Sequence, residues 1–253
     1  MTDAELVHLD VDGAVATVTL DSPHNRNALS RQLVAELTER MTTAAASAGL
    51  RAVVLTHTGT TFCAGADLSE ASTGPMAGAA SGLLSLIRLI VELPLPVLAR
   101  IDGNVRAGGI GLLGACDIVV AGPRSTFAIT EARVGLAAAV ISVSVLPRID
   151  ARSAARYYLT GAIFDVAEAQ RIGLVTSAAD DVDAAMAMFI AELRKASPQG
   201  LIESKRIANR GVREAIERYG DEMVDLSARL FASEEAHEGM TAFLERRPPR
   251  WTA

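Results

Sequence analysis

Two turns of small residues, lying about forty positions apart, are the part of this sequence best suited to chemistry. Residues 62–68 read Phe-Cys-Ala-Gly-Ala-Asp-Leu, and residues 102–109 read Asp-Gly-Asn-Val-Arg-Ala-Gly-Gly. We expect each turn where a strand gives way to a helix, so that backbone N–H groups lie unpaired near a positive dipole end. Two such turns brought together would donate two N–H groups to one carbonyl oxygen, as stabilisation of an oxyanion or enolate requires. One turn alone is explained as well by a tight chain reversal, but the pair favours an oxyanion hole.

The elements around these turns follow from the hydrophobic pattern. Strands are predicted over 14–20, 51–56, 97–101, 118–121 and 126–128, and a helix is predicted over 31–47 with Ser30 as its cap. An apolar helix around 83–90 ends before Pro94 and Pro96, and the Gly/Ser/Ala-rich stretch 71–82 predicts a loop. Alternation of strands and helices over 10–130 indicates βα crossovers and a mostly parallel sheet. From about residue 136 onward the pattern is nearly all helical.

Composition narrows the classes of function. The 253 residues suffice for one large domain or two small ones, with 50% hydrophobic and 21% charged residues. A net charge of −6 argues against a general nucleic-acid binder, although backbone amides can still hold an anionic ligand. Cys63 and Cys116 have no metal-ligand spacing, and we expect both to be buried and no metal to be bound. No signal peptide or stretch of ~18 to 20 apolar residues is evident, so a cytoplasmic protein without membrane contact is expected.

Several segments in a fixed order resemble one known family. They comprise residues 23–29, 64–68, 99–118, 127–135, 159–161, 167–175 and 243–248. In this order they resemble the crotonase superfamily, the enoyl-CoA hydratase/isomerase group, from about residue 5 to the C-terminus. The resemblance implies an α/β fold, a crotonase-like spiral of repeated ββα units in two stacked sheets over residues 1–196. It also implies a helical C-terminal lobe over 197–253 that joins subunits into a homotrimer or a dimer of trimers.

The resemblance also assigns roles to the two turns. It makes the amides of Ala66 and Gly108 the oxyanion donors, acting on the thioester carbonyl of an acyl-CoA. The residues that it places against coenzyme A are Ala64, Ala66, Asp67, Leu68 and Gly108, together with His24, Asn25 and Arg26. From the residues alone, Asp67 is explained equally as a helix cap, and Arg26 as an exposed cation without a specific role.

The acid–base residues depart from the family pattern. The best-known hydratases hold water between two glutamates, and the first of these positions is Gly111 here, which cannot transfer a proton. The second position is Glu131, which is therefore the expected catalytic carboxylate. Its alternative reading is a charge at the start of a helix or a partner for Arg133. Some family branches that act on branched-chain or glutaconyl-type thioesters share a small residue at the first position, so Gly111 is compatible with hydration.

Residues 109–114 form a literal G-x-G-x-x-G, which on its own would suggest dinucleotide binding. The context does not fit that fingerprint, because residues 102–108 separate the first glycine from the preceding strand. The acidic residue about twenty positions later, Glu131, lies beyond the next strand rather than at its end. We interpret Gly111 and Gly114 instead as residues that let the helix pack closely against the sheet.

The predicted activity is that of an enoyl-CoA hydratase-like lyase of fatty acid and lipid metabolism, with coenzyme A as part of the substrate and no separate cofactor. Residues 136–144 are more apolar than a Pro-Gly-rich turn, which indicates an acyl pocket for aliphatic chains or a helix packed in the core. An enoyl-CoA isomerase and a catalytically degenerate acyl-CoA-binding protein remain as alternatives. Leu226, Leu230, Phe231 and Phe243 are expected to cover the core or to pack on a neighbouring subunit.

Overall fold

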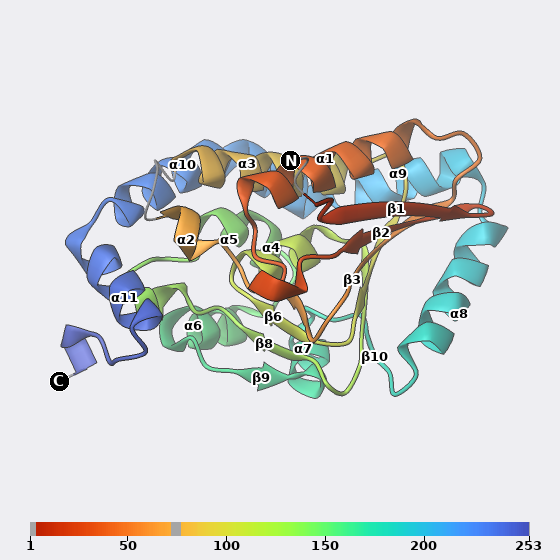
Figure 1. Cartoon of the computed structure of the whole chain (residues 1–253). Coiled ribbons are helices and arrows are strands. Elements are labelled where there is room, and N and C mark those ends of the chain that lie inside the picture. Colours follow the sequence, from red (N-terminus) through yellow and green to blue (C-terminus); the bar gives the residue numbers. More distant parts are fainter. Residues whose placement is uncertain (1–3, 72–76, 253) are drawn as a thin grey trace.

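Two sheets of strands lie at the centre of the computed structural model, and helices cover them (Figure 1). The structure describes residues 4–71 and 77–252. The first sheet has the order β1-β2-β3-β5-β7-β10 and the second has the order β4-β6-β8-β9. The strands are β1 (Val7–Asp12), β2 (Val15–Leu20), β3 (Ala52–His57), β4 (Thr61–Cys63), β5 (Val97–Ile101), β6 (Asn104–Arg106), β7 (Ile118–Ala121), β8 (Thr126–Ala128), β9 (Phe164–Asp165) and β10 (Ser177–Ala178).

The helices follow the strands in a repeating pattern. They are α1 (Arg31–Ala46), α2 (Leu68–Ala71), α3 (Ala77–Glu92), α4 (Gly108–Ala115), α5 (Ala139–Val145), α6 (Ala151–Thr160), α7 (Val166–Ile172), α8 (Val182–Lys195), α9 (Pro198–Ala208), α10 (Arg210–Phe231) and α11 (Glu234–Leu244), with the 3-10 helices η1 (Pro23–Asn25), η2 (Glu131–Val134) and η3 (Arg250–Thr252).

The chain alternates between the two sheets, which confirms the spiral of ββα units. β3, β5 and β7 pair in parallel in the first sheet, and each is followed directly by a strand of the second sheet, β4, β6 or β8. A helix then leads to the next pair. Only the terminal pairings, β1 with β2 and β8 with β9, are antiparallel among the described strands. Because each unit ends with a strand followed by a turn into a helix, equivalent turns from successive units lie side by side.

The predicted strands of the first sheet and β8 of the second sheet are found, but the edge strands β1 and β10 and the strands β4, β6 and β9 were not predicted. β1 carries polar residues at His8, Asp10 and Asp12, and β4, β6, β9 and β10 span only two or three residues each. The four short segments lack a run of residues long enough to identify a strand. β1, by contrast, alternates Val7, Leu9 and Val11 with these polar residues, which is a strand pattern that the prediction omitted. The loop predicted over 71–82 lies partly outside the described residues at 72–76, and it was wrong from Ala77 onward, where α3 begins.

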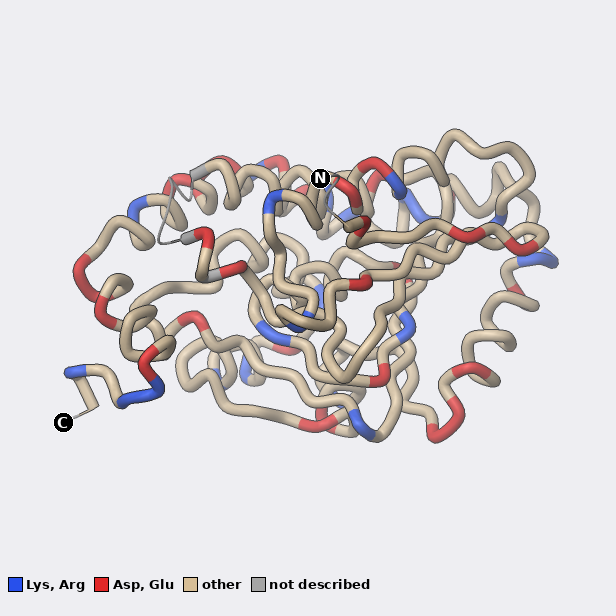
Figure 2. The backbone as a smooth tube through the Cα atoms, viewed as in Figure 1, with Lys and Arg blue, Asp and Glu red and all other residues tan. Residues whose placement is uncertain are grey.

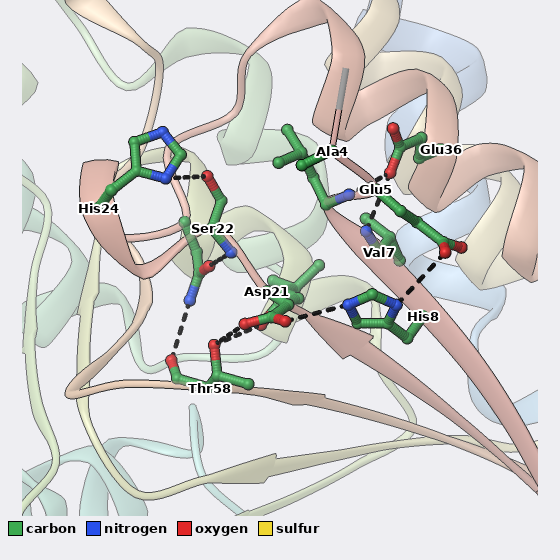
Figure 3. Close-up of polar contacts among 12 residues, drawn as sticks. Ala4, Glu5, Val7, His8, Asp21, Ser22, His24, Glu36 and Thr58 are labelled. Atoms are coloured by element: carbon green, nitrogen blue, oxygen red, sulfur yellow. Dashed lines mark hydrogen bonds and ion pairs between the residues drawn. The ribbon is translucent and has the colours of Figure 1, made fainter. Parts of the chain in front are cut away.

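The edge strand β1 pairs with β2 along its whole length and buries Val7, and side-chain contacts hold it further. The Glu36 carboxylate on α1 accepts hydrogen bonds from the amides of Leu6 (2.6 Å) and Val7 (2.9 Å). Asp21 lies 3.0 Å from the His8 ring and accepts a 2.5 Å hydrogen bond from the Thr58 hydroxyl (Figure 3). These hydrogen bonds lower the pKa of Asp21, with the Thr58 contribution the larger. The contacts therefore fix the end of β2, which leads directly into η1.

The C-terminal helices pack on the spiral rather than standing apart from it. α10 lies against α3 and α5, and α11 lies against η2 (Figure 1). Buried Lys205 on α9 forms a 3.0 Å ion pair with Asp117, which follows α4 in the chain. Whether residues 197–253 act as a trimerisation lobe stays a prediction, because the structure contains one chain.

Candidate active site

The two small-residue turns meet in the structure. The amide of Leu29 donates a 2.8 Å hydrogen bond to the Gly65 carbonyl, and Leu29 and Ala66 form an isolated parallel bridge. Gly65 has a φ of +92°, and a Cβ at this position would lie 2.7 Å from the Ala107 Cβ and 3.5 Å from the Gly108 nitrogen. Glycine is therefore required here both by backbone conformation and by the close approach of the second turn.

The backbone of the second turn turns sharply before α4. Ala107 has a φ of +47°, an uncommon conformation for a residue with a side chain, and its amide donates to the Ala128 carbonyl at 3.1 Å. Its own carbonyl accepts from the Ile110 amide at 2.8 Å, which closes the first turn of the helix. Gly108, the first residue of α4, then presents an amide at the positive end of that helix.

The amides of Ala66 and Gly108 are available to a ligand. Within residues 4–71 and 77–252, neither amide donates a hydrogen bond to another group of the protein. Both residues line one cavity of about 620 Å³. Unpaired backbone donors that face a cavity are what an oxyanion hole requires. The structure thus brings the two predicted donors together, while their catalytic role stays a prediction.

Glu131 lines the same cavity, from the start of η2. Its Oε2 atom is shielded from solvent and has no hydrogen-bond partner among the described residues. Burial raises the pKa of this carboxyl to about 7, against a smaller lowering by the backbone amides of Glu131 and Thr130. A carboxyl group whose pKa lies near neutrality can both take up and return a proton, which suits general acid–base catalysis.

The alternative partner for Glu131 is engaged elsewhere. The Arg133 guanidinium donates from Nε to the Thr160 carbonyl at 2.8 Å, at the end of α6. Gly161, which follows, has a φ of +60°, and a Cβ there would lie 2.9 Å from the Arg133 Nε. Arg133 therefore ties η2 to α6, and no cation among the described residues contributes to the pKa of Glu131. The other interpretation, that Glu131 is a charge at the start of a helix, is supported only by the hydrogen bonds of two backbone amides to its carboxyl.

Gly111, where the resemblance places the family's first glutamate, packs against a neighbouring side chain. A Cβ on Gly111 would lie 2.5 Å from Cγ2 and 2.9 Å from Cβ of Ile141, and 3.4 Å from Cδ1 of Ile87. Ile141 belongs to α5 and itself lines the cavity. Glu131 is therefore without a second carboxylate opposite it at this position, and an apolar wall stands there instead.

The other glycines of α4 also serve packing. A Cβ on Gly114 would lie 2.7 Å from the Ser144 carbonyl oxygen, and one on Gly109 would lie 2.8 Å from the Cβ of Cys63. The prediction that Gly111 and Gly114 face the sheet was wrong, since both face α5. The sequence could not show this, because α5 and α4 are brought together only by tertiary packing.

The predicted coenzyme A segments lie together at the mouth of the cavity. Asn25 of η1 donates a 3.1 Å hydrogen bond to Asp67, which in turn accepts from the amide (3.0 Å) and hydroxyl (2.6 Å) of Ser69. Asp67 is thus both the cap of α2 and a link between the two segments, and these hydrogen bonds together lower its pKa against the opposing effect of burial. His24, Asn25, Arg26, Ala64 and Asp67 line the cavity, and Leu68 begins α2.

One side of the cavity is apolar, and the sequence identified only part of it. The predicted stretch 136–144 contributes Leu136 to Ile141, so the wall and the buried helix are one feature. The C-terminal helices contribute Ser227, Phe231, Phe243 and Leu244, two of which we expected to cover the core or a neighbouring subunit. Thr130 and Val134 beside Glu131 were missed, although their closeness in sequence to Glu131 was a usable signal.

Charges and metal-ligating residues are dispersed over the described chain. Figure 2 shows acidic and basic positions interspersed along the backbone. Among residues 4–71 and 77–252, no group of three or more His, Cys, Asp or Glu side chains has an arrangement that could hold a metal ion. None of the described helices is long and apolar enough to cross a membrane.

Comparison with known proteins agrees with the fold. A family model described as enoyl-CoA hydratase/isomerase matches residues 10–253. The solved structure of an enoyl-CoA hydratase from Mycobacterium avium is 52% identical, with a TM-score of 0.92 over 98% of this chain and 99% of that one. A solved structure from Mycobacterium avium paratuberculosis K-10 is 53% identical, with a TM-score of 0.93 over 98% of this chain and 100% of that one. The mevalonyl-coenzyme A hydratase of Aspergillus fumigatus is 32% identical over 94% of this chain and 91% of its own.

Proposed function

The chain belongs to the enoyl-CoA hydratase/isomerase family, and we propose that it is an enoyl-CoA hydratase-like lyase that adds water to the double bond of a 2-enoyl-CoA thioester. The observation that carries this proposal is the single cavity that both the amides of Ala66 and Gly108 and the carboxyl of Glu131 line. The names of two relatives, an enoyl-CoA hydratase and a mevalonyl-coenzyme A hydratase, support hydration rather than another reaction of the family.

In the proposed reaction, the two amides donate hydrogen bonds to the thioester oxygen. They draw electrons from the conjugated double bond and make the β-carbon electrophilic. Charged Glu131 removes a proton from water while the water oxygen forms its bond to the β-carbon, and the π electrons move toward the thioester as an enolate. The same carboxyl then returns its proton to the α-carbon. The sum is H and OH added across the double bond, with Glu131 charged again at the end.

The electrostatics of Glu131 fit both halves of this cycle. A pKa of about 7 leaves comparable amounts of base and acid near neutral pH, so one group can accept and release the proton. The apolar wall that includes Val140 and Ile141 favours an aliphatic acyl chain over a polar one.

The second candidate function is enoyl-CoA isomerisation. It is favoured by the Ile141 side chain at the position of the missing first glutamate, because moving a proton between two carbons needs only one carboxyl group. In that reaction Glu131 would take a proton from one carbon and return it to another, with no water consumed. A catalytically degenerate acyl-CoA-binding protein would keep the cavity and perform neither step.

A small panel of thioesters separates these functions. The protein is incubated with crotonyl-CoA and, separately, with a 3-enoyl-CoA, while absorbance of the conjugated thioester and product mass are followed. Hydration predicts loss of conjugation with gain of the mass of water from crotonyl-CoA. Isomerisation predicts gain of conjugation from the 3-enoyl-CoA at constant mass. Unchanged substrates together with measurable binding would contradict both enzymatic proposals.

We further propose a cytoplasmic homotrimer or dimer of trimers that uses no cofactor other than the coenzyme A of its substrate. The exposed apolar side chains of Leu159 (79% exposed) and Ile163 (63%), at and beyond the end of α6, support burial against another subunit. We place the proposed activity in fatty acid and lipid metabolism, because its proposed substrate is an acyl-CoA thioester.

A further inference from the structure

Two buried polar atoms on neighbouring elements lack a partner, and we propose that they act together. They are Oε2 of Glu131 on η2 and the hydroxyl of Tyr158 on α6. Among the described residues these are the only buried side-chain oxygen or nitrogen atoms without a hydrogen bond. Each such atom in a folded protein calls for a physical explanation, because an unpaired buried polar group is destabilising.

The two elements are fixed against each other. α6 packs on η2, and the Arg133 Nε of η2 donates its 2.8 Å hydrogen bond to the Thr160 carbonyl, two residues beyond Tyr158. Gly161 packs so closely on the same guanidinium that a Cβ there would lie 2.9 Å from the Arg133 Nε. Tyr158 and Glu131 also interact electrostatically, since the carboxylate contributes, after burial, to raising the pKa of the phenol. Tyr158 is not among the residues that line the cavity, whereas Glu131 is.

We infer that Tyr158 is a positioning residue whose hydroxyl holds Oε2 of Glu131 through one bridging water molecule when the carboxylate is charged, since the two oxygens make no direct hydrogen bond in the structure. Oε2 is the enclosed oxygen of a residue that lines the cavity, so a bond there leaves the other oxygen, Oε1, to serve the substrate. A hydrogen bond to a charged carboxylate is stronger than one to the neutral acid. It would stabilise the base and hold its orientation.

No other charged group explains the behaviour of this carboxyl. The charged and titratable groups on the packed elements are Arg133 on η2, Arg152 and Arg156 on α6, and Glu234, Glu235, His237 and Glu238 on α11. Burial and two backbone amides account for the shift of the Glu131 pKa, without contributions from these groups. The Tyr158 hydroxyl is therefore the one buried side-chain donor without a hydrogen bond among the described residues.

The neighbouring tyrosine supplies a matched control. The Tyr157 hydroxyl donates a 2.8 Å hydrogen bond to Glu168, and its ring packs on Phe164 with centroids 4.2 Å apart. Tyr157→Phe therefore removes the same atom from the same helix, from a site that does not face Glu131. Tyr158→Phe removes a hydroxyl and keeps the ring, so the packing of α6 is retained.

The test is an NMR titration of the Glu131 carboxyl, which does not depend on turnover. The positioning role of Tyr158 itself rests on the proposed function. The carboxyl carbons of glutamate are labelled with ¹³C, and the Glu131 resonance is assigned by its loss in Glu131→Gln. Tyr158→Phe should raise the NMR midpoint of Glu131 by about one to two pH units, the size expected for losing a hydrogen bond to a charged group. Tyr157→Phe should leave that midpoint in place.

Kinetics on the same variants test positioning. The acidic limb of the kcat profile should move upward with the NMR midpoint in Tyr158→Phe, while KM stays within about twofold, since Tyr158 does not line the cavity. The pKa of about 7 arises from burial and two backbone amides without this hydrogen bond, so it is the value expected for the variant. At pH 7 a shift of one unit lowers the charged fraction from about nine-tenths to about half, so kcat falls about twofold. An unchanged midpoint in Tyr158→Phe would overturn the inference whatever the activity. A shifted midpoint in a protein without turnover would uphold the contact and contradict the proposed function.

Discussion

Glu131→Gln is expected to stabilise the free protein in a pH-dependent way while it removes activity. The physical reason is that burial holds the pKa of Glu131 at about 7, above its ordinary value of 4.5. When the folded-state pKa of a group lies above its unfolded-state pKa, the group does not lower the free energy of unfolding at pH values below the unfolded-state pKa. Stability is then lost as pH rises toward the folded pKa, because unfolding releases a proton that the folded state retains. The loss is complete above about pH 7, and glutamine, which does not titrate, is not subject to it.

The magnitude follows from the two pKa values. The charged form of Glu131 should destabilise the folded protein by about 3 kcal/mol at pH 8 but only about 1 kcal/mol at pH 5. Glu131→Gln should therefore gain about 2 kcal/mol more stability at pH 8 than at pH 5, measured relative to the parent protein. Taking this difference between pH values cancels any pH-independent effect of the amide group. Residues that activity requires often lower the stability of the folded protein, and a buried catalytic carboxylate is one such case.

Urea unfolding at the two pH values measures this difference directly. Parent, Glu131→Gln and Glu222→Gln are unfolded in parallel, the last being a matched control at an exposed position of α10. The control should show the same relative stability at both pH values to within about 0.5 kcal/mol. If Glu131→Gln behaved like Glu222→Gln, the carboxyl of Glu131 would not be desolvated, and the argument for a base poised near neutrality would be refuted.

Further predictions concern the proposed oxyanion donor Gly108, the packing of α4 at Gly111, and the oligomeric state. Gly108→Pro removes the proposed donor and should lower kcat by ~10² to 10³. Gly108→Ala should be milder, because its Cβ would overlap only with the movable end of Leu29 at 2.7 Å, while its other neighbours lie at ordinary contact distance. Full activity of a folded proline variant would contradict the oxyanion hole. Gly111→Ala should lower the free energy of unfolding by about 1 to 3 kcal/mol through overlap with Ile141, and Ile141→Ala in the same chain should absorb part of that loss; additive effects in thermal unfolding would argue against the contact. Light scattering at micromolar concentration should give the mass of a trimer or of a dimer of trimers, and a monomer mass would contradict the proposed assembly.

The sequence predicted the framework best where one strand or helix carries its own signal. β5, β7 and β8 were predicted at their observed bounds, and Ser30 caps α1 by accepting from the Leu33 amide at 3.2 Å. These elements have apolar runs or caps that act over a few residues. β1 was missed although Val7, Leu9 and Val11 alternate with polar residues, whereas its pairing with β2 and its contact with Glu36 are not visible within the strand itself.

The residues of the candidate site also divide into those that the sequence could predict and those that depend on tertiary packing. Ala66, Gly108 and Glu131 could be proposed from the order of motifs, and the structure places all three around one cavity. What fills the space beside Gly111 could not be proposed, because the contact with Ile141 depends on how α5 packs across α4. Tyr158 gave no signal for the same reason, since a tyrosine in an amphipathic helix is ordinarily a packing residue.

The most direct test of the central claim is hydration of crotonyl-CoA in ¹⁸O-labelled water by the parent protein and by Glu131→Gln. The account predicts that the parent forms a 3-hydroxyacyl-CoA that carries the label. It also predicts that Glu131→Gln binds the thioester with nearly the same affinity but turns it over ~10² to 10⁴ times more slowly. A Glu131→Gln protein that incorporates the label at the parent rate would show that another group carries the proton, and would contradict the account.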